Sequence, residues 1–218
     1  MSLRYALLAV LTARPKTGYD VSKGFHSSVG HVWHAPDSQV YPELRRMEED
    51  GLLSSKDIPW GTRGKKKLYT VTEAGIKDFR TWLETPFDYS LTRDPLALKT
   101  AYMEWGDPQG LQTQLDDHIA FHKSLVDQWQ ATIAALESQT DEVLMDRLGA
   151  SNKDEWALIT GYKTLAYRGL VSRALAEVAW AEEAKEEAAK LEKKFGKKVS
   201  TRKATQPLRT ADEIPEKV

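Results

Sequence analysis

Apolar side chains recur at helical spacing between Asp37 and Gly51. Val40, Leu44 and Met47 fall at i, i+4 and i+7, so they form one stripe of an α-helix that begins near Asp37. At about 100° per residue, the other side and the flanks of this helix carry polar and basic residues. These residues are Ser38, Gln39, Tyr41, Pro42, Arg45 and Arg46. The pattern predicts a helix that packs on a core and presents a polar, basic face.

An extended hairpin is predicted after this helix. Leu52 and Leu53 lead into one strand, and residues 67–72 form a second in which Tyr69 and Val71 share a face by period-two alternation. The segment between them, 59–66, is rich in turn residues and carries cations but no acid.

Capping residues and periodicity predict shorter helices on both sides of the hairpin. Ser2 and Thr17 are candidate N-caps of the first two helices, and Asp20 makes Thr17 part of a capping-box variant. Thr72 is a third candidate N-cap. Asp94 followed by Pro95 starts another helix, predicted to reach Gly106. The helix after Thr72 has an expected inward stripe of Ile76, Phe79, Trp82 and Leu83.

Two long helices are predicted over residues 108–137 and 153–195. The first has a nearly heptad seam of Leu111, Leu115, His118, His122, Leu125, Trp129, Ile133 and Leu136. The second has apolar residues on more than one side in its first half, including Leu158, Tyr162 and Leu165. Because one chain offers one surface to cover, the second surface predicts a partner subunit in a twofold dimer.

Composition supports a globular protein and excludes several chemistries. The 218 residues are 41% hydrophobic, which is enough to fill a core. The absence of cysteine excludes disulfides, thiolate metal sites and cysteine nucleophiles. No apolar run approaches the ~20 residues of a membrane span, and no export signal is found, so we expect no membrane association and a cytoplasmic location.

The net charge of −1 is unevenly distributed. Residues 1–86 carry 13 Lys and Arg against 10 Asp and Glu, a net of +3, whereas residues 87–195 carry 12 against 19, a net of −7. Residues 196–218, with 6 against 3, are predicted to be a flexible basic tail that is mainly solvated. A nucleic acid would therefore meet the N-terminal part.

The sequence has no catalytic motif, so we predict that the protein is not an enzyme and uses no cofactor. His31 and His34 flank Trp33 without other ligands at metal-binding spacing, which favours simple packing over a metal site. His118 and His122 lie on one helix face, where they could be structural, hold a ligand carboxylate or bind a metal. We predict no metal site, because buried polar groups usually have an ordinary structural partner.

The N-terminal motifs resemble those of the PadR-like family of winged-helix transcriptional regulators. The matching segments are Thr17-Gly18-Tyr19-Asp20-Val21, Ser38-Gln39-Val40-Tyr41-Pro42-Glu43-Leu44, Met47-Glu48-Glu49-Asp50-Gly51-Leu52 and Leu68-Tyr69-Thr70-Val71-Thr72 with Gly75. Leu96-Ala97-Leu98-Lys99 also resembles the opening of the family's C-terminal domain, in the subgroup where that domain is large and helical.

The resemblance implies a mainly α fold with a small two-stranded β-wing. An N-terminal winged helix-turn-helix (1–86) would be followed by a C-terminal helical dimerisation domain (87–195) and the tail (196–218). The protein would be a homodimeric bacterial repressor that reads a near-palindromic operator in double-stranded DNA. The alternative is a winged-helix module that binds a protein partner without sequence-specific DNA readout.

Candidate DNA contacts follow from residue type and from the resemblance. Tyr19 and Lys23 would meet phosphates, as the family's second helix does, although Tyr19 could instead pack on the third helix. Ser38, Gln39 and Arg45 are candidates for base edges, and Tyr41, Arg63, Lys65, Lys66 and Lys67 for phosphates. The resemblance also implies a small phenolic or aromatic effector. The candidate residues that bind it are Tyr102, Trp105, His118, His122 and Trp156.

Overall fold

The computed structural model describes residues 3–26, 35–61, 64–89 and 93–205, with side chains as far as residue 195. Its residues fall into two compact units, 1–89 with 132–165 and 90–131 with 166–218, which are treated separately below. Ser2, His31, Trp33, His34 and Arg63 lie outside the described residues, as does most of the predicted tail.

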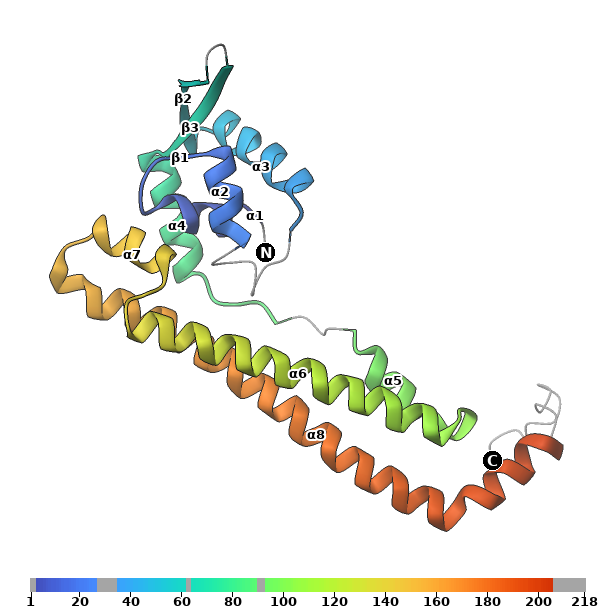
Figure 1. Ribbon diagram of the computed structural model, residues 1–218. Helices are drawn as coiled ribbons and strands as arrows, with labels where there is room; N and C mark the ends of the chain where they lie inside the picture. Colours follow the sequence, from blue (N-terminus) through green and yellow to red (C-terminus); the bar gives the residue numbers. More distant parts are fainter. Residues whose placement is uncertain (1–2, 27–34, 62–63, 90–92, 206–218) are drawn as a thin grey trace. The chain divides into compact units, whose positions relative to one another are not determined.

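The first unit begins with four helices and a small sheet (Figure 1). Its elements are α1 (Leu3–Leu11), β1 (Lys16–Thr17), α2 (Gly18–Gly24), α3 (Asp37–Glu49), β2 (Leu53–Trp60), β3 (Gly64–Val71) and α4 (Glu73–Glu84). The sheet is antiparallel in the order β1-β3-β2, with Lys16 opposite Tyr69 and Leu53 opposite Val71. The mainly helical winged fold is confirmed, and β1 adds a third strand to the two predicted.

A single hydrophobic core joins α1, α2, α3 and the sheet. Leu7, Val21, Val40, Leu44 and Met47 are fully buried in it, so the predicted inward stripe of α3 is confirmed. Tyr69 is buried and Val71 packs beside it, as the strand alternation predicted. Burial of each such side chain contributes about 1.5–3 kcal/mol, which makes this core the main support of the unit.

Local signals set the element boundaries. Thr17 and Thr72 cap α2 and α4, accepting hydrogen bonds from the backbone of Asp20 (3.3 Å) and Gly75 (3.1 Å) as predicted. After α3 the chain turns at Gly51, whose φ of +75° is a left-handed conformation that glycine adopts without steric penalty.

Two local predictions for this unit are wrong, and one helix was not predicted. The basic segment after β2 is not a long loop, because Pro59 and Trp60 belong to β2 and Lys65 and Lys66 to β3. The predicted stripe of α4 ends early: Phe79 packs on the core and Trp82 stacks on Tyr5, but Leu83 is 61% exposed. The helix α7 (Glu142–Gly149), capped by Asp141, was not predicted. Its Asp146 pairs with Arg14 and Lys16.

The second unit is built on two long helices (Figure 1). Its elements are α5 (Pro95–Ala101), the 3-10 turn η2 (Met103–Trp105), most of α6 (Pro108–Glu137) and most of α8 (Trp156–Thr205), which follows the turn η3 (Lys153–Glu155). Asp94 caps α5 as predicted, accepting from Ala97 N at 2.9 Å, but α5 ends at Ala101 instead of continuing to Gly106. α8 continues beyond its predicted end near residue 195.

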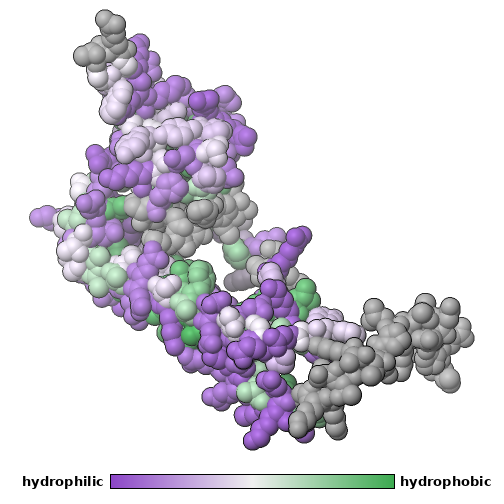
Figure 2. All heavy atoms as spheres, turned by 45° about the vertical axis from the view of Figure 1, so that its right-hand side comes forward, coloured by the Kyte–Doolittle hydropathy of each residue, from purple (hydrophilic) through white to green (hydrophobic). Residues whose placement is uncertain are grey.

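The seam predicted on α6 faces α8 within this unit. Leu111 and Leu115 pack with Ala181, and Trp129 packs with Ala174. These clusters are small, and large apolar side chains remain at the surface among hydrophilic ones (Figure 2). Among the helices that the structure describes, none is long and apolar enough to cross a membrane.

Candidate nucleic-acid interface

The exposed face of α3 is the centre of the candidate interface. Ser38, Gln39 and Arg45 are exposed there, while the buried stripe of the same helix fixes their orientation. Arg46 differs from Arg45, because its guanidinium pairs with Glu43 at 3.1 Å. The candidates for base contacts are thus accessible on a rigid helix, as direct readout of a groove requires.

Hydrogen bonds to Asp37 tie α2 to the start of α3. Asp37 accepts from Ser22 Oγ and contacts His26 Nε2 at 3.1 Å. These two hydrogen bonds, with the charge of His26, hold the pKa of Asp37 below its ordinary value, against a weaker opposing effect of desolvation.

The α2–α3 contact is also close at Gly18. A Cβ atom there would lie 2.8 Å from Cε1 of Tyr41, so the glycine allows the Tyr41 ring to pack against α2. Tyr41 keeps 37% of its surface exposed, and Tyr19 is 64% exposed on the first turn of α2. Lys23 is exposed on the same helix. All three candidates for phosphate contacts on α2 and α3 are therefore accessible.

Glu48 joins α3 to both strands of the wing. Its carboxylate accepts from Ser55 Oγ at 2.6 Å and from Lys67 Nζ at 2.8 and 3.1 Å. The hydrogen bond from Lys67 lowers the pKa of Glu48, and the same bond raises the pKa of Lys67. The sequence indicated Glu48 only as part of a motif. Its role in linking α3 to the wing was missed, because this role depends on the register between the helix and the hairpin.

The lysines of the wing differ in how firmly neighbouring side chains hold them. Lys65 is highly exposed and makes one long ion pair, 3.7 Å, with Asp57. Lys66 lies over the ring of Trp60, which is itself 59% exposed. Exposed ion pairs contribute little to stability, so Lys65 can exchange Asp57 for a phosphate at small cost. Lys67 is already held by Glu48, and Arg63 lies outside the described residues.

The candidate effector residues are divided between the two units. His118 and His122 of α6 lie together in the second unit, with ring centroids 4.3 Å apart, and Glu177 of α8 joins them. Tyr102 and Trp105 are exposed, whereas Trp156 belongs to the first unit and donates from Nε1 to the Leu148 carbonyl at 3.0 Å.

A hollow of about 850 Å³ lies in the second unit between η2, α6 and α8. Met103, Leu111, Ala188, Leu191 and Phe195 give it a largely apolar lining. Tyr102 and Trp105 flank Met103 in the sequence, but neither belongs to the described lining. The hollow is therefore separate from the exposed rings that the sequence suggested.

A helix-turn-helix followed by a basic two-stranded hairpin defines a winged-helix DNA-binding domain. In the comparison with known proteins, residues 7–81 match the transcriptional regulator PadR-like family, and residues 92–189 match the virulence activator alpha C-terminal family. The chain thus carries a PadR-like family domain, homologous to PadR transcriptional regulators, with a larger helical C-terminal region. These homologues are transcriptional regulators, which is a non-enzymatic role.

Two curated relatives match parts of the chain. The negative transcriptional regulator PadR of Bacillus subtilis is 36% identical over 81 residues, which are 37% of this chain and 44% of that protein. A probable transcriptional regulator of Mycobacterium tuberculosis is 29% identical over 126 residues, 53% of this chain and 66% of the relative. The matched regions span less than two thirds of either relative.

Solved structures match most of the fold. Bacillus subtilis PadR in complex with operator DNA has a TM-score of 0.68 at 24% identity, covering 85% of this chain and 98% of that one. The structure of the same protein in complex with p-coumaric acid has a TM-score of 0.64 at 22% identity, covering 86% of this chain and 98% of that one. The structure of the Vibrio cholerae virulence activator AphA has a TM-score of 0.65 at 26% identity, covering 87% of this chain and 99% of that one.

Proposed function

We propose that this protein is a homodimeric, sequence-specific DNA-binding transcriptional regulator. The observation that carries the proposal is the common frame of α3 and the wing. Ser38, Gln39 and Arg45 project from a helix whose other side is buried, and Glu48 links that helix to the strand bearing Lys65 and Lys66. One rigid unit thus presents candidates for base contacts and cations for phosphates. The likeness to PadR, solved with operator DNA, supports the proposal.

The side chains divide into two roles. Ser38, Gln39 and Arg45 would read base edges in a major groove. Tyr19, Lys23, Tyr41, Arg63, Lys65 and Lys66 would meet phosphates. Lys67 was also a candidate for a phosphate contact, but its ion pair with Glu48 assigns it first to holding the wing against α3.

Self-association is supported by an uncovered apolar stripe on α8. Leu158, Tyr162 and Leu165 fall at i, i+4 and i+7 and are 60%, 68% and 65% exposed. Such a stripe on one helix is what a second copy covers in a twofold interface. The dimer would place one recognition helix on each half of a near-palindromic operator.

Repression released by a small aromatic effector is the further part of the proposal. Its support is that the Bacillus subtilis relative is named a negative regulator and was solved with p-coumaric acid. The candidates for effector contacts remain Tyr102, Trp105, His118, His122 and Trp156, although Trp156 already has its indole nitrogen satisfied. An effector acts by binding one dimer geometry better than another.

The proposal is tested by DNA binding across a salt series. The purified protein should bind duplex from its own promoter region more tightly than random duplex of equal length, with two subunits per site. In the double variant Lys65→Gln/Lys66→Gln, affinity for both duplexes should fall. The slope of log affinity against log salt should flatten by about two units, because two phosphate contacts are lost.

Lys193→Gln/Lys194→Gln is the matched control, since it removes two adjacent lysines of α8 outside the winged helix. Its salt slope should equal that of the unmodified protein. An unchanged slope in the wing variant would remove the wing from the interface. Equal, weak binding of the unmodified protein to both duplexes would contradict sequence-specific readout and favour a protein partner for the winged helix.

A further inference from the structure

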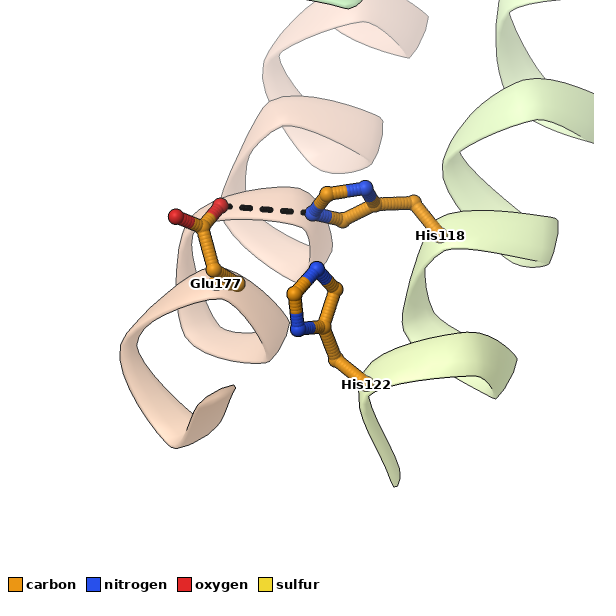
Figure 3. Close-up of side chains that lie close together, drawn as sticks. All are labelled: His118, His122 and Glu177. Carbon is orange, nitrogen blue, oxygen red and sulfur yellow. Dashed lines mark hydrogen bonds and ion pairs between the residues drawn. The ribbon is translucent and has the colours of Figure 1, made fainter. Parts of the chain in front are cut away.

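Two histidines and a glutamate meet between α6 and α8, inside the second unit. His118 and His122 are one helical turn apart on α6, and Glu177 reaches them from α8, 59 residues after His118 (Figure 3). His118 Nε2 lies 3.3 Å from Glu177 Oε2. One ligand atom from each residue lies within 4.8 Å of the other two.

These separations fit a shared cation after small side-chain movements. Metal–nitrogen and metal–oxygen distances of about 2.0–2.1 Å with tetrahedral angles put neighbouring ligand atoms roughly 3.3 Å apart. The His118–Glu177 pair already has that spacing. Bringing the remaining separations, which are at most 4.8 Å, to this spacing requires side-chain movements of up to roughly 1.5 Å. Glu177 has freedom to move, because 49% of its side chain is exposed.

His122 carries an unsatisfied nitrogen. Its Nδ1 is buried and has no hydrogen-bond partner among the described residues. A buried polar atom without a partner costs about 1–3 kcal/mol and calls for an explanation. The other ring nitrogen, Nε2, is the one turned toward His118 and Glu177 (Figure 3), so an ion would bind there and Nδ1 would carry the ring proton.

Aromatic neighbours restrict the two imidazoles. Trp180 and His118 form a T-shaped pair with 5.7 Å between ring centroids, and Phe121 and His122 form another at 5.1 Å. Rings held by packing lose little freedom on binding an ion, which favours coordination.

We propose that His118, His122 and Glu177 bind a divalent transition-metal ion of the zinc type. Two imidazoles and one carboxylate are a ligand set for such ions and not for magnesium or calcium, which prefer oxygen ligands. Three protein ligands leave one coordination position for water or another exchangeable ligand. The sequence alone predicted no metal here, because Glu177 is brought to the histidines only by the register of α6 on α8.

Isothermal titration of the full-length chain with zinc chloride tests this proposal. The protein is freed of metal by chelation and dialysis, carries no affinity tag and contains no DNA, so failure of the proposed DNA binding would not affect the result. We expect one zinc ion bound per chain at this cluster and no comparable binding of magnesium. His118→Gln and His122→Gln should each weaken zinc binding by at least about 100-fold, since losing a direct ligand exceeds the 10–100-fold effect of losing an outer partner.

Glu177→Gln should weaken zinc binding less, by roughly 10-fold, because water can replace a carboxylate ligand. Glu183→Gln is the matched control, since Glu183 is an exposed glutamate of the same helix and lies on another side by helical spacing. It should bind zinc like the unmodified chain.

Nuclear magnetic resonance of the unmodified chain keeps the test independent of how the variants fold. Zinc should shift the ring signals of His118 and His122 and leave those of His26 unchanged. Absence of zinc binding, or zinc binding that persists unchanged in both histidine variants, would overturn the proposal. Unshifted His118 and His122 signals at saturating zinc would do the same.

Discussion

The winged helix and the paired long helices bury their apolar side chains in different ways. In the first, side chains from α1, α2, α3 and the sheet meet in one core, where Leu44 and Met47 are fully buried. In the second, α6 and α8 meet through small clusters around Ala174 and Ala181. The winged helix is complete within one chain, whereas α8 carries an exposed apolar stripe that the proposed dimer would cover.

Leu44→Ala should have the largest effect, because it opens a cavity in the complete core. A fully buried leucine replaced by alanine lowers the free energy of unfolding by about 3–5 kcal/mol. Urea unfolding, followed by amide exchange in α1–α3, measures the loss. Leu83→Ala is the control: Leu83 is 61% exposed, so its variant should stay within about 0.5 kcal/mol of the unmodified chain. Equal losses in both variants would contradict the assigned core.

Leu165→Ala should act on association and leave the fold intact. Leu165 is 65% exposed in the single chain, and if a second copy covers it, truncation removes about 1.5–3 kcal/mol of apolar burial. The dimer dissociation constant, measured by sedimentation equilibrium, should then rise by roughly 10- to 100-fold. Leu83→Ala should leave the constant unchanged. A dimer that is equally stable with Leu165→Ala would move the interface away from this stripe.

Arg45→Ala should lower discrimination between promoter and random DNA by about 1–3 kcal/mol, as expected for loss of a base contact. Arg46→Ala is the neighbouring control, because Arg46 pairs with Glu43 and is not assigned a base. The measurement is the ratio of dissociation constants for the two duplexes at one salt concentration. A uniform loss on both duplexes in Arg45→Ala would instead make this side chain a phosphate contact.

What the sequence predicted well was local. The stripe of Val40, Leu44 and Met47, and the caps at Thr17 and Thr72, are set by neighbours within a few residues, and the structure confirms them. α7 also had a local signal, since Asp141 precedes Leu144 and Leu148 at i, i+4 spacing, but this signal was overlooked.

The errors came from features that depend on distant partners. Lys65 and Lys66 were assigned to a loop because the segment 59–66 is rich in turn residues, yet pairing with β2 makes them part of a strand. Leu83 fits the helical period of α4 but extends beyond the surface that α1 covers. The approach of Glu48 to Lys67, and of Glu177 to His118, depends on tertiary register that no local pattern encodes.

Asp146→Asn tests the link between α7 and the start of the chain, and should have the smallest effect. Burial acts to raise the pKa of Asp146, but the hydrogen bond from Lys16 and the charges of Lys16 and Arg14 outweigh it and hold the pKa below 3.8. Because the folded-state pKa is the lower one, the stabilisation is complete above the unfolded-state pKa. It is lost as the pH falls through the folded-state value.

The unmodified chain should therefore exceed Asp146→Asn by about 1 kcal/mol in unfolding free energy at pH 7, as expected for a partly exposed ion pair. The difference should shrink as the pH falls below about 4, because protonated Asp146 no longer attracts Arg14 and Lys16. Asp88→Asn, at an exposed position, is the control and should show no such pH-dependent difference. A gap between Asp146→Asn and the unmodified chain that stays constant from pH 7 to pH 2 would mean that packing, and not charge, holds α7 in the first unit.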